Sequence, residues 1–269
     1  MIETIKKEWS AQLAVLFFVL MTAWWLFIFL SGFQETPQNY AFAATYGLIC
    51  LLGGFYGIWY AQKWGGFYSV VGRTMIVLSL GLLFQEFGQI VFSFYNIYLG
   101  VEVPYPSLAD LGFFGSIPFY IWGAILLAKA AGSKFSLKSF SNQIQAFAIP
   151  IFMLVLTYMF FLRGYEVDWT DSLKVFLDFG YPLGEAIYIS IAILAYSLSR
   201  KILGGVMRNK ILFLIGAFII QYIADFNFLF QSSRGTWING SYGDYLYFLA
   251  YFMMTLGLIQ LKTVLNKLE

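Results

Sequence analysis

The 269-residue chain is 60% hydrophobic and only 11% charged, which leaves no room for a soluble domain beside its apolar segments. It contains no histidine and a single cysteine, Cys50, so an internal disulfide, a thiolate metal cluster, ordinary haem ligation and a Ser-His-Asp triad are excluded. We therefore expect a single membrane domain over residues 1–269 that holds no cofactor and no resident metal.

Eight apolar runs along the chain are long enough to cross a bilayer, because a helix needs about 20 residues to span the hydrocarbon layer. The expected spans are about 10–32, 40–62, 70–98, 109–131, 142–162, 174–199, 209–231 and 243–263. They predict an all-α integral membrane protein, an eight-span helical bundle built from four repeated helix hairpins.

The basic residues gather on one side when these spans are threaded alternately through the membrane. Of the 16 Lys and Arg residues, 13 fall in segments on the side of the N-terminus: Lys6, Lys7, Lys63, Arg73, Lys129, Lys134, Lys138, Arg200, Lys201, Arg208, Lys210, Lys262 and Lys267. Only Arg163, Lys174 and Arg234 fall on the other side. Because basic loops stay in the cytoplasm, the pattern predicts that both the N-terminus and the C-terminus are cytoplasmic.

Three segments resemble copies of one helix hairpin, at 73–129, about 149–201 and 208–262. Each carries a short motif where its second helix is expected to begin. A proline fits the first turn of a helix, and an acid there meets the positive end of the helix dipole. The residues of this helix-start motif are Tyr105, Pro106 and Asp110 in the first copy, Tyr181, Pro182 and Glu185 in the second, and Asp244 in the third.

Two acidic residues, Glu86 and Asp225, lie well inside apolar runs, with the amides Gln89 and Gln221 three or four positions away on the same helix face. A charged group at membrane depth is costly, so it should face a cavity or a partner. With Asn227, these residues form our candidate ligand-binding set. Three interpretations stay open: hydrogen bonds that join helices, a ligand pocket, and a path for ions or protons. No Lys or Arg lies at mid-depth to neutralise the acids, so they are either protonated or compensated from outside.

The segments YPSLADLGFFGSIPFYIWGAILL, YPLGEAIYISIAIL and GDYLYFLAYFMMTLGLIQL resemble the N-terminal membrane sensory domains of bacterial signalling proteins. Those multi-span domains precede GGDEF, EAL or histidine-kinase output domains. The resemblance covers about 70–262 and implies a sensor-like helical bundle without naming its ligand. This chain departs from the pattern at Glu185, which replaces an Asp, and we expect no output domain after Glu269. The resemblance also implies a multi-pass protein of the bacterial inner membrane.

The leading hypothesis is therefore a non-enzymatic membrane sensor that binds a small or lipophilic ligand and signals to a separate cytoplasmic partner. A small transporter is an alternative, although the broken Gly/Pro helices of transporters are not evident in the sequence. An accessory subunit of a larger membrane complex is another. The expected partners are the lipid bilayer, a cytoplasmic signalling protein or other membrane subunits, and a second copy of the chain, but no nucleic acid.

Overall fold

The computed structural model describes residues 2–130, 140–159, 163, 169–199, 208–232 and 234–265. All regular elements in these residues are helical. They are α1 (Ile2–Lys7), α2 (Trp9–Leu30), α3 (Pro37–Thr45), α4 (Leu48–Ala61), η1 (Gln62–Trp64), η2 (Gly66–Tyr68), α5 (Val70–Ser93), η3 (Phe94–Leu99), α6 (Leu108–Ala130), α7 (Phe140–Thr157), α8 (Ser172–Ser199), α9 (Arg208–Ser232) and α10 (Tyr242–Leu265).

Seven helical stretches are long and apolar enough to cross a membrane: Trp9–Leu30, Pro37–Trp64, Val70–Leu99, Leu108–Ala130, Ser172–Ser197, Lys210–Ser232 and Tyr242–Lys262. They correspond to seven of the eight predicted spans, and their lengths and composition are those of a multi-pass membrane protein. The described part of the remaining predicted span, 142–162, is the shorter apolar helix Ser141–Thr157, and residues 160–162 lie outside the described part.

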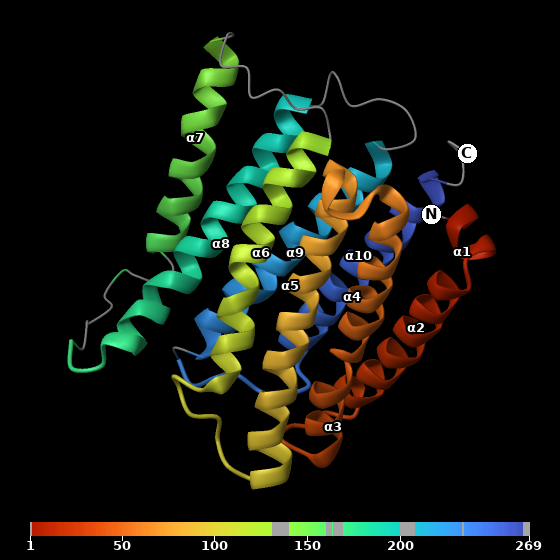
Figure 1. The fold of residues 1–269 in the computed structure, drawn as a ribbon. Coiled ribbons are helices and arrows are strands. Elements are labelled where there is room, and N and C mark those ends of the chain that lie inside the picture. The colour runs from red at the N-terminus through yellow and green to blue at the C-terminus, as the bar shows by residue number, and fades with distance from the viewer. Residues whose placement is uncertain are drawn as a thin grey trace.

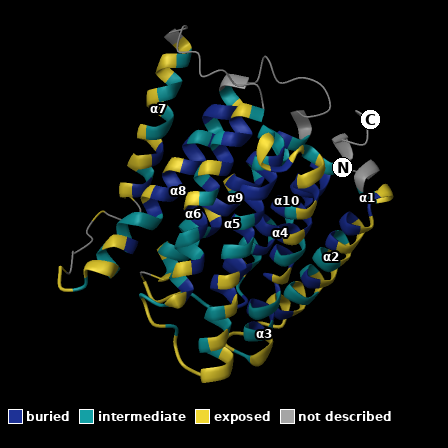
Figure 2. Ribbon diagram, in the orientation of Figure 1, coloured by how far each residue is buried: buried dark blue, intermediate teal, exposed yellow. Residues whose placement is uncertain are grey.

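Six helices form a closed ring in the order α4, α5, α6, α8, α9, α10, with α10 packed back against α4 (Figure 1). α2 lies outside the ring against α10, and α7 lies outside it against α8. The predicted pairs α5–α6, α7–α8 and α9–α10 are packed neighbours, whereas α2 contacts α10 more than α3 or α4. The exposed faces of α2 and α7 are apolar, and the ring interior is buried (Figure 2).

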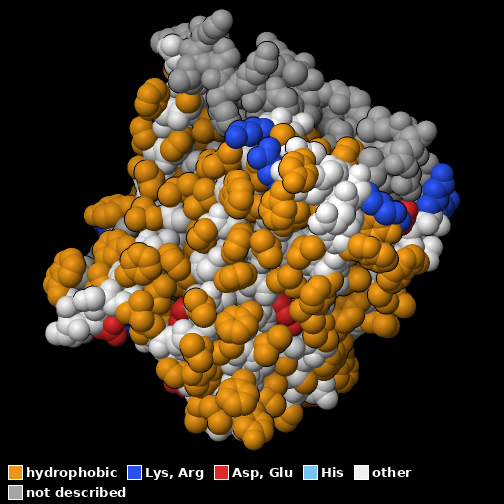
Figure 3. Space-filling model, in the orientation of Figure 1, with side chains coloured by type: hydrophobic (Ala, Val, Ile, Leu, Met, Phe, Trp, Pro, Cys, Tyr) orange, Lys and Arg blue, Asp and Glu red, His pale blue; other side chains and the backbone are white. Residues whose placement is uncertain are grey.

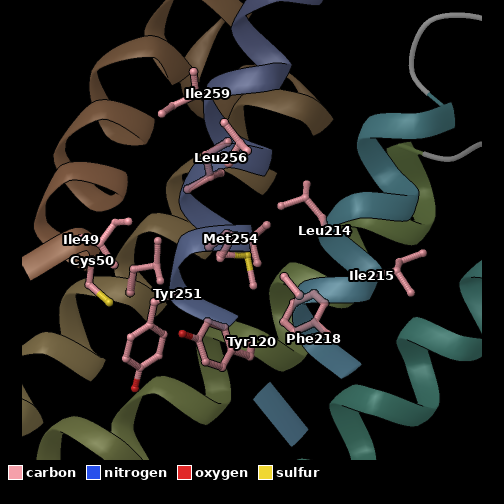
Figure 4. Close-up of a cluster of buried hydrophobic side chains, with 14 of the residues drawn as sticks. Ile49, Cys50, Tyr120, Leu214, Ile215, Phe218, Tyr251, Met254, Leu256 and Ile259 are labelled. Atoms are coloured by element: carbon pink, nitrogen blue, oxygen red, sulfur yellow. The ribbon is translucent and has the colours of Figure 1, made fainter. Parts of the chain in front are cut away.

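Aromatic side chains fill the centre of the ring. Tyr120, Tyr188, Phe218 and Tyr251 are each 1% exposed or less and come from α6, α8, α9 and α10. Figure 4 shows three of them, Tyr120, Phe218 and Tyr251. The Phe218 ring meets that of Tyr120 nearly edge to face, with 5.7 Å between centroids. Between membrane helices, such close packing stabilises the bundle through dispersion, since lipid is as apolar as the side chains.

α5 and α6 approach each other closely at two glycines. A Cβ atom added to Gly112 would lie 2.3 Å from the backbone nitrogen of Gly88 and 2.6 Å from the carbonyl oxygen of Phe84. Small residues allow membrane helices to pack backbone against backbone in this way. This contact fixes α5, which carries Glu86 and Gln89, against α6.

The two ends of the described chain lie on the same side of the bundle (Figure 1). The Lys262 ammonium near the end of α10 forms an ion pair with the Glu8 carboxylate at the start of α2, and the Trp64 indole donates to the Leu261 carbonyl at 3.2 Å. Lys and Arg side chains on the face drawn in Figure 3 gather near this end. We call it the basic end. Lys134, Lys138, Arg200, Lys201 and Lys267, which the charge prediction also used, lie outside the described residues.

Two of the three predicted helix-start motifs do begin helices. At 105–110, the Ser107 backbone N–H donates to Asp110 Oδ2 at 2.7 Å as α6 begins. At the start of α10, the Gly240 N–H donates to Asp244 Oδ2 at 2.6 Å. Both acids bind backbone donors at a helix N-terminus, as predicted.

The prediction of a helix start at Tyr181, Pro182 and Glu185 is wrong. α8 begins at Ser172, where Asp171 Oδ1 accepts a hydrogen bond from the Lys174 N–H at 3.0 Å. Pro182 therefore lies inside the helix, which membrane helices tolerate when neighbours satisfy the backbone. The consequence for function is that Glu185, expected at the outer surface, is a buried acid in the middle of a span.

Candidate functional site

The ring contains four acids that have no cationic partner among the described residues. Glu86, Glu185 and Asp244 are at most 3% exposed, and Asp225 is partly exposed. Both Glu86 and Asp225 face neighbouring helices, as the sequence predicted. Because an unpaired charge inside a low-dielectric bundle is costly, these carboxyl groups are the first candidates for function.

The span that faces Glu86 is broken, although no broken helix is evident in the sequence. α3 ends at Thr45 and α4 begins at Leu48, so Tyr46 and Gly47 form a junction within the second span. The Glu86 carboxyl is packed against this junction: a Cβ atom on Gly47 would lie 2.2 Å from Glu86 Oε2. A side chain at this position would displace the Glu86 carboxyl group.

Glu86 Oε2 is buried and has no hydrogen-bond partner in the described part of the chain. Both polar atoms of the neighbouring Gln89 side chain are hydrogen-bonded. The Gln89 side-chain amide donates to the Ala43 carbonyl at 2.7 Å, and its oxygen accepts from the Tyr46 hydroxyl at 3.2 Å. Gln89 thus gives the Ala43 carbonyl the hydrogen bond that a continuous helix would otherwise have supplied. Gln89 of α5 therefore holds the junction in place. The unpaired acid Glu86, one turn earlier on α5, packs against the same junction.

Replacing Gln89 with leucine is expected to lower the free energy of unfolding by about 1–3 kcal/mol, because it leaves the buried Ala43 carbonyl without the hydrogen bond from Gln89. Reversible unfolding in mixed micelles would measure the change. Thr74→Ala is the control, since that buried α5 hydroxyl bonds only to Val70 O of its own helix. Equal stability of Gln89→Leu and the control would contradict this role for Gln89.

A second polar group joins α8 and α9. The Gln221 amide donates to both oxygens of Asp225, at 3.0 and 3.1 Å, and the Tyr188 hydroxyl donates to Asp225 Oδ2 at 3.2 Å. The predicted shared face of Gln221 and Asp225 is confirmed. Glu185 also interacts with Asp225 electrostatically and belongs to the same group.

The candidate ligand-binding set does not form one site. Glu86 and Gln89 lie at the α3–α4 junction, whereas Gln221 and Asp225 lie between α8 and α9, with Tyr120 and Tyr251 between α4 and α9 (Figure 4). The side-chain oxygen of the fifth member, Asn227, accepts a hydrogen bond from the Tyr242 hydroxyl of α10 at 2.9 Å.

Buried tyrosines connect the polar groups, and the sequence analysis did not single them out. The Tyr251 hydroxyl donates to Gln85 Oε1 at 2.8 Å, and the Gln85 amide reaches Ser116 Oγ at 2.7 Å. Tyr46 and Tyr188 bind Gln89 and Asp225 in the same manner. Their signal in the sequence is a tyrosine far from a span end, where an interfacial position does not explain it.

The motifs of the first two hairpin copies contact each other between α6 and α8. The Tyr181 hydroxyl donates to Asp110 Oδ1 and the Tyr105 hydroxyl donates to Asp178 Oδ1, both at 2.8 Å. These bonds join the outer parts of two neighbouring helices, away from the basic end. We therefore assign Tyr105, Asp110 and Tyr181 to helix packing rather than to the candidate site.

One hollow lies between α2 and α4 and is lined by apolar residues only: Leu13, Phe17, Leu48, Ile49 and Leu52. In the described part of the chain, no three His, Cys, Asp or Glu side chains converge as a metal site would need.

No protein-family model, curated protein or solved structure matches this chain. Function must therefore be argued from the buried acids and the broken span.

Proposed function

We propose that this protein is a non-enzymatic sensor module of the bacterial inner membrane that signals to a separate cytoplasmic partner. The observation that carries the proposal is the unpaired Glu86 carboxyl group against the Gly47 junction. A proton or small ligand that reaches Glu86 changes the charge at this junction. Because the junction has a break in its backbone hydrogen bonding, it is where the second span bends most readily.

α4 is suited to carry that bend to the basic end. It runs without interruption from Leu48 to Ala61, and the next residues contact the end of α10. The Lys262 ammonium lies 4.5 Å from the centroid of the Tyr60 ring, and Trp64 bonds to the Leu261 carbonyl. A shift of α4 as a rigid rod would move these contacts, which is a common way for helices to transmit a signal.

The eight-span topology with both termini in the cytoplasm is part of the proposal. Two observations support it: the ends of the described chain lie together, which requires an even number of crossings, and the basic residues gather at that end. α7 then counts as a crossing beside the seven longer helical stretches. The resemblance to bacterial sensory domains supports the same interpretation, with the output supplied by another protein.

The proposal predicts that Glu86→Gln, which fixes this group in an uncharged form, alters the basic end about half a membrane away. Spin labels on cysteines at the exposed positions Gln62 and Lys129, in a Cys50→Ala background, would report distances between α4 and α6. We expect a shifted or narrowed distance distribution relative to the parent protein. Thr74→Ala, on the same helix, should leave the distribution unchanged. Identical distributions for the parent and Glu86→Gln would refute coupling.

A transporter is the second candidate, because transporters place their substrate sites at breaks in membrane helices. Here the break at Tyr46–Gly47 faces a buried acid, which is the arrangement that such a site uses. Proteoliposomes on a solid-supported membrane would detect a current driven by an ion or substrate gradient. A current that disappears in Glu86→Gln would favour transport over sensing.

A further inference from the structure

We propose that the ligand of Glu86 is a proton, so that pH is the stimulus to which the α3–α4 junction responds. This inference rests on the proposed sensing role of the junction and names the stimulus that the role leaves open. Its main evidence is the packing around the Glu86 carboxyl group, which leaves room for a proton but not for an ion or an organic molecule.

The Glu86 carboxyl group is enclosed by protein atoms. The side chain is 1% exposed, and no water-sized space adjoins Oε2. On one side of it lies the Gly47 backbone, where an added Cβ would be 2.2 Å from Oε2 and 3.2 Å from both the Glu86 Cδ and the Gln89 Cγ. A metal ion or an organic ligand needs at least the space of a water molecule beside a carboxylate oxygen. A proton needs none.

No positive charge near Glu86 compensates its ionised form. The titratable side chains on the second span and on α10 around this position are phenols, a thiol and an acid: Tyr46, Cys50, Tyr251 and Asp244. The α6 residues that face this part of α5 are glycine, phenylalanine and Ser116. An unpaired carboxylate in such surroundings is costly, whereas a protonated carboxyl group is uncharged. The packing therefore fits protonated Glu86, and loss of the proton requires the surroundings to change.

The break in the second span supplies a hydrogen-bond donor for the ionised form. In a continuous helix the Gly47 N–H would bind the Ala43 carbonyl. Here the Gln89 amide binds that carbonyl, and the described part of the chain has no backbone hydrogen bond from the Gly47 N–H. Gly47 is also the residue that Glu86 Oε2 contacts. Because a carboxylate accepts hydrogen bonds more strongly than a neutral acid, ionisation would draw this N–H toward Oε2 and turn the start of α4.

Infrared difference spectroscopy of the purified full-length protein in lipid nanodiscs tests the protonation directly. The carbonyl stretching band of a protonated carboxyl group should be present in the parent at acidic pH, absent in Glu86→Gln and lost from the parent as the pH rises. Because no water-sized space adjoins Oε2, exchange of this proton in D₂O should be slower than that of exposed acids. Glu86→Asp keeps the acid and should keep a titrating band at a shifted frequency.

Glu35→Gln is the matched control, since it removes the carboxyl group of an exposed glutamate and should leave the Glu86 band unchanged. Identical spectra of the parent and Glu86→Gln at every pH would overturn the proposal. So would a band that disappears on addition of NaCl at constant pH, because that result would assign the site to a cation.

Spin-label distances between positions 62 and 129 separate the stimulus from the sensing role. The parent at acidic pH should match Glu86→Gln, and it should depart from that variant as the carboxyl group ionises. If the infrared band titrates while the distances stay constant, the proton site stands and the sensing role fails. Equal pH-dependent changes of distance in the parent and Glu86→Gln would place the pH response on another group and contradict the proposal.

Discussion

Gly112→Ala is expected to destabilise the bundle by about 1–3 kcal/mol, the usual cost of overpacking a tight interior. The added methyl group would lie 2.3 Å from Gly88 N and 2.6 Å from Phe84 O, and these backbone atoms cannot rotate away. α5 and α6 would have to separate. Thermal unfolding in detergent, followed by far-ultraviolet circular dichroism, should show a lower Tm than that of the parent.

Gly216→Ala is the matched control, because it is also a glycine-to-alanine change inside a span. Its added methyl would meet only the flexible end of Met253, 3.2 Å away. Alanine is the better helix former by roughly 1 kcal/mol, so this variant should be as stable as the parent or slightly more stable. Equal Tm values for Gly112→Ala and Gly216→Ala would show that the α5–α6 backbone contact is not as close as the structure has it.

Lys262→Met is expected to cost about 3–5 kcal/mol, as breaking a buried ion pair generally does. The Lys262 and Glu8 side chains are only 13% and 8% exposed, so removal of the ammonium leaves a shielded carboxylate without its partner. The α2–α10 contact at the basic end would loosen. Unfolding in increasing fractions of a denaturing detergent would measure the loss, and faster proteolysis before Trp9 should accompany it.

A double variant tests whether charge, rather than packing, is responsible. Glu8→Gln combined with Lys262→Met removes both charges and should recover most of the lost stability, since no unpaired charge remains. If the double variant is as unstable as Lys262→Met alone, the contribution of Lys262 comes from the contact of its ammonium group with the Tyr60 ring instead.

The individual residues of the candidate site could be predicted from the sequence, but their grouping in space could not. Glu86, Gln89, Gln221 and Asp225 attract attention because polar groups inside apolar runs are rare and costly, and that argument needs no neighbours. Their division into two groups could not be foreseen, because it depends on which helices are adjacent in the ring. Glu185 was misplaced for a related reason: α8 continues through Pro182, a residue that often marks a helix start.

The break at Tyr46–Gly47 could not be predicted from the sequence either. Tyr46 and Gly47 keep right-handed helical φ and ψ values, so the break involves no unusual backbone conformation that a residue type would reveal. It is stabilised from outside the span by Gln89, which binds the Ala43 carbonyl from α5. A junction maintained by a distant side chain leaves no local pattern.

The sequence by itself determined that this chain is helical, multi-span and charge-asymmetric, because span length and basic loops are properties of contiguous residues in contact with lipid and water. The tertiary structure decided the ring order, the aromatic centre formed by Tyr120, Phe218 and Tyr251, and the partners of each buried acid. Those features depend on side-chain contacts between helices, and apolar helices of similar composition can pack in many orders.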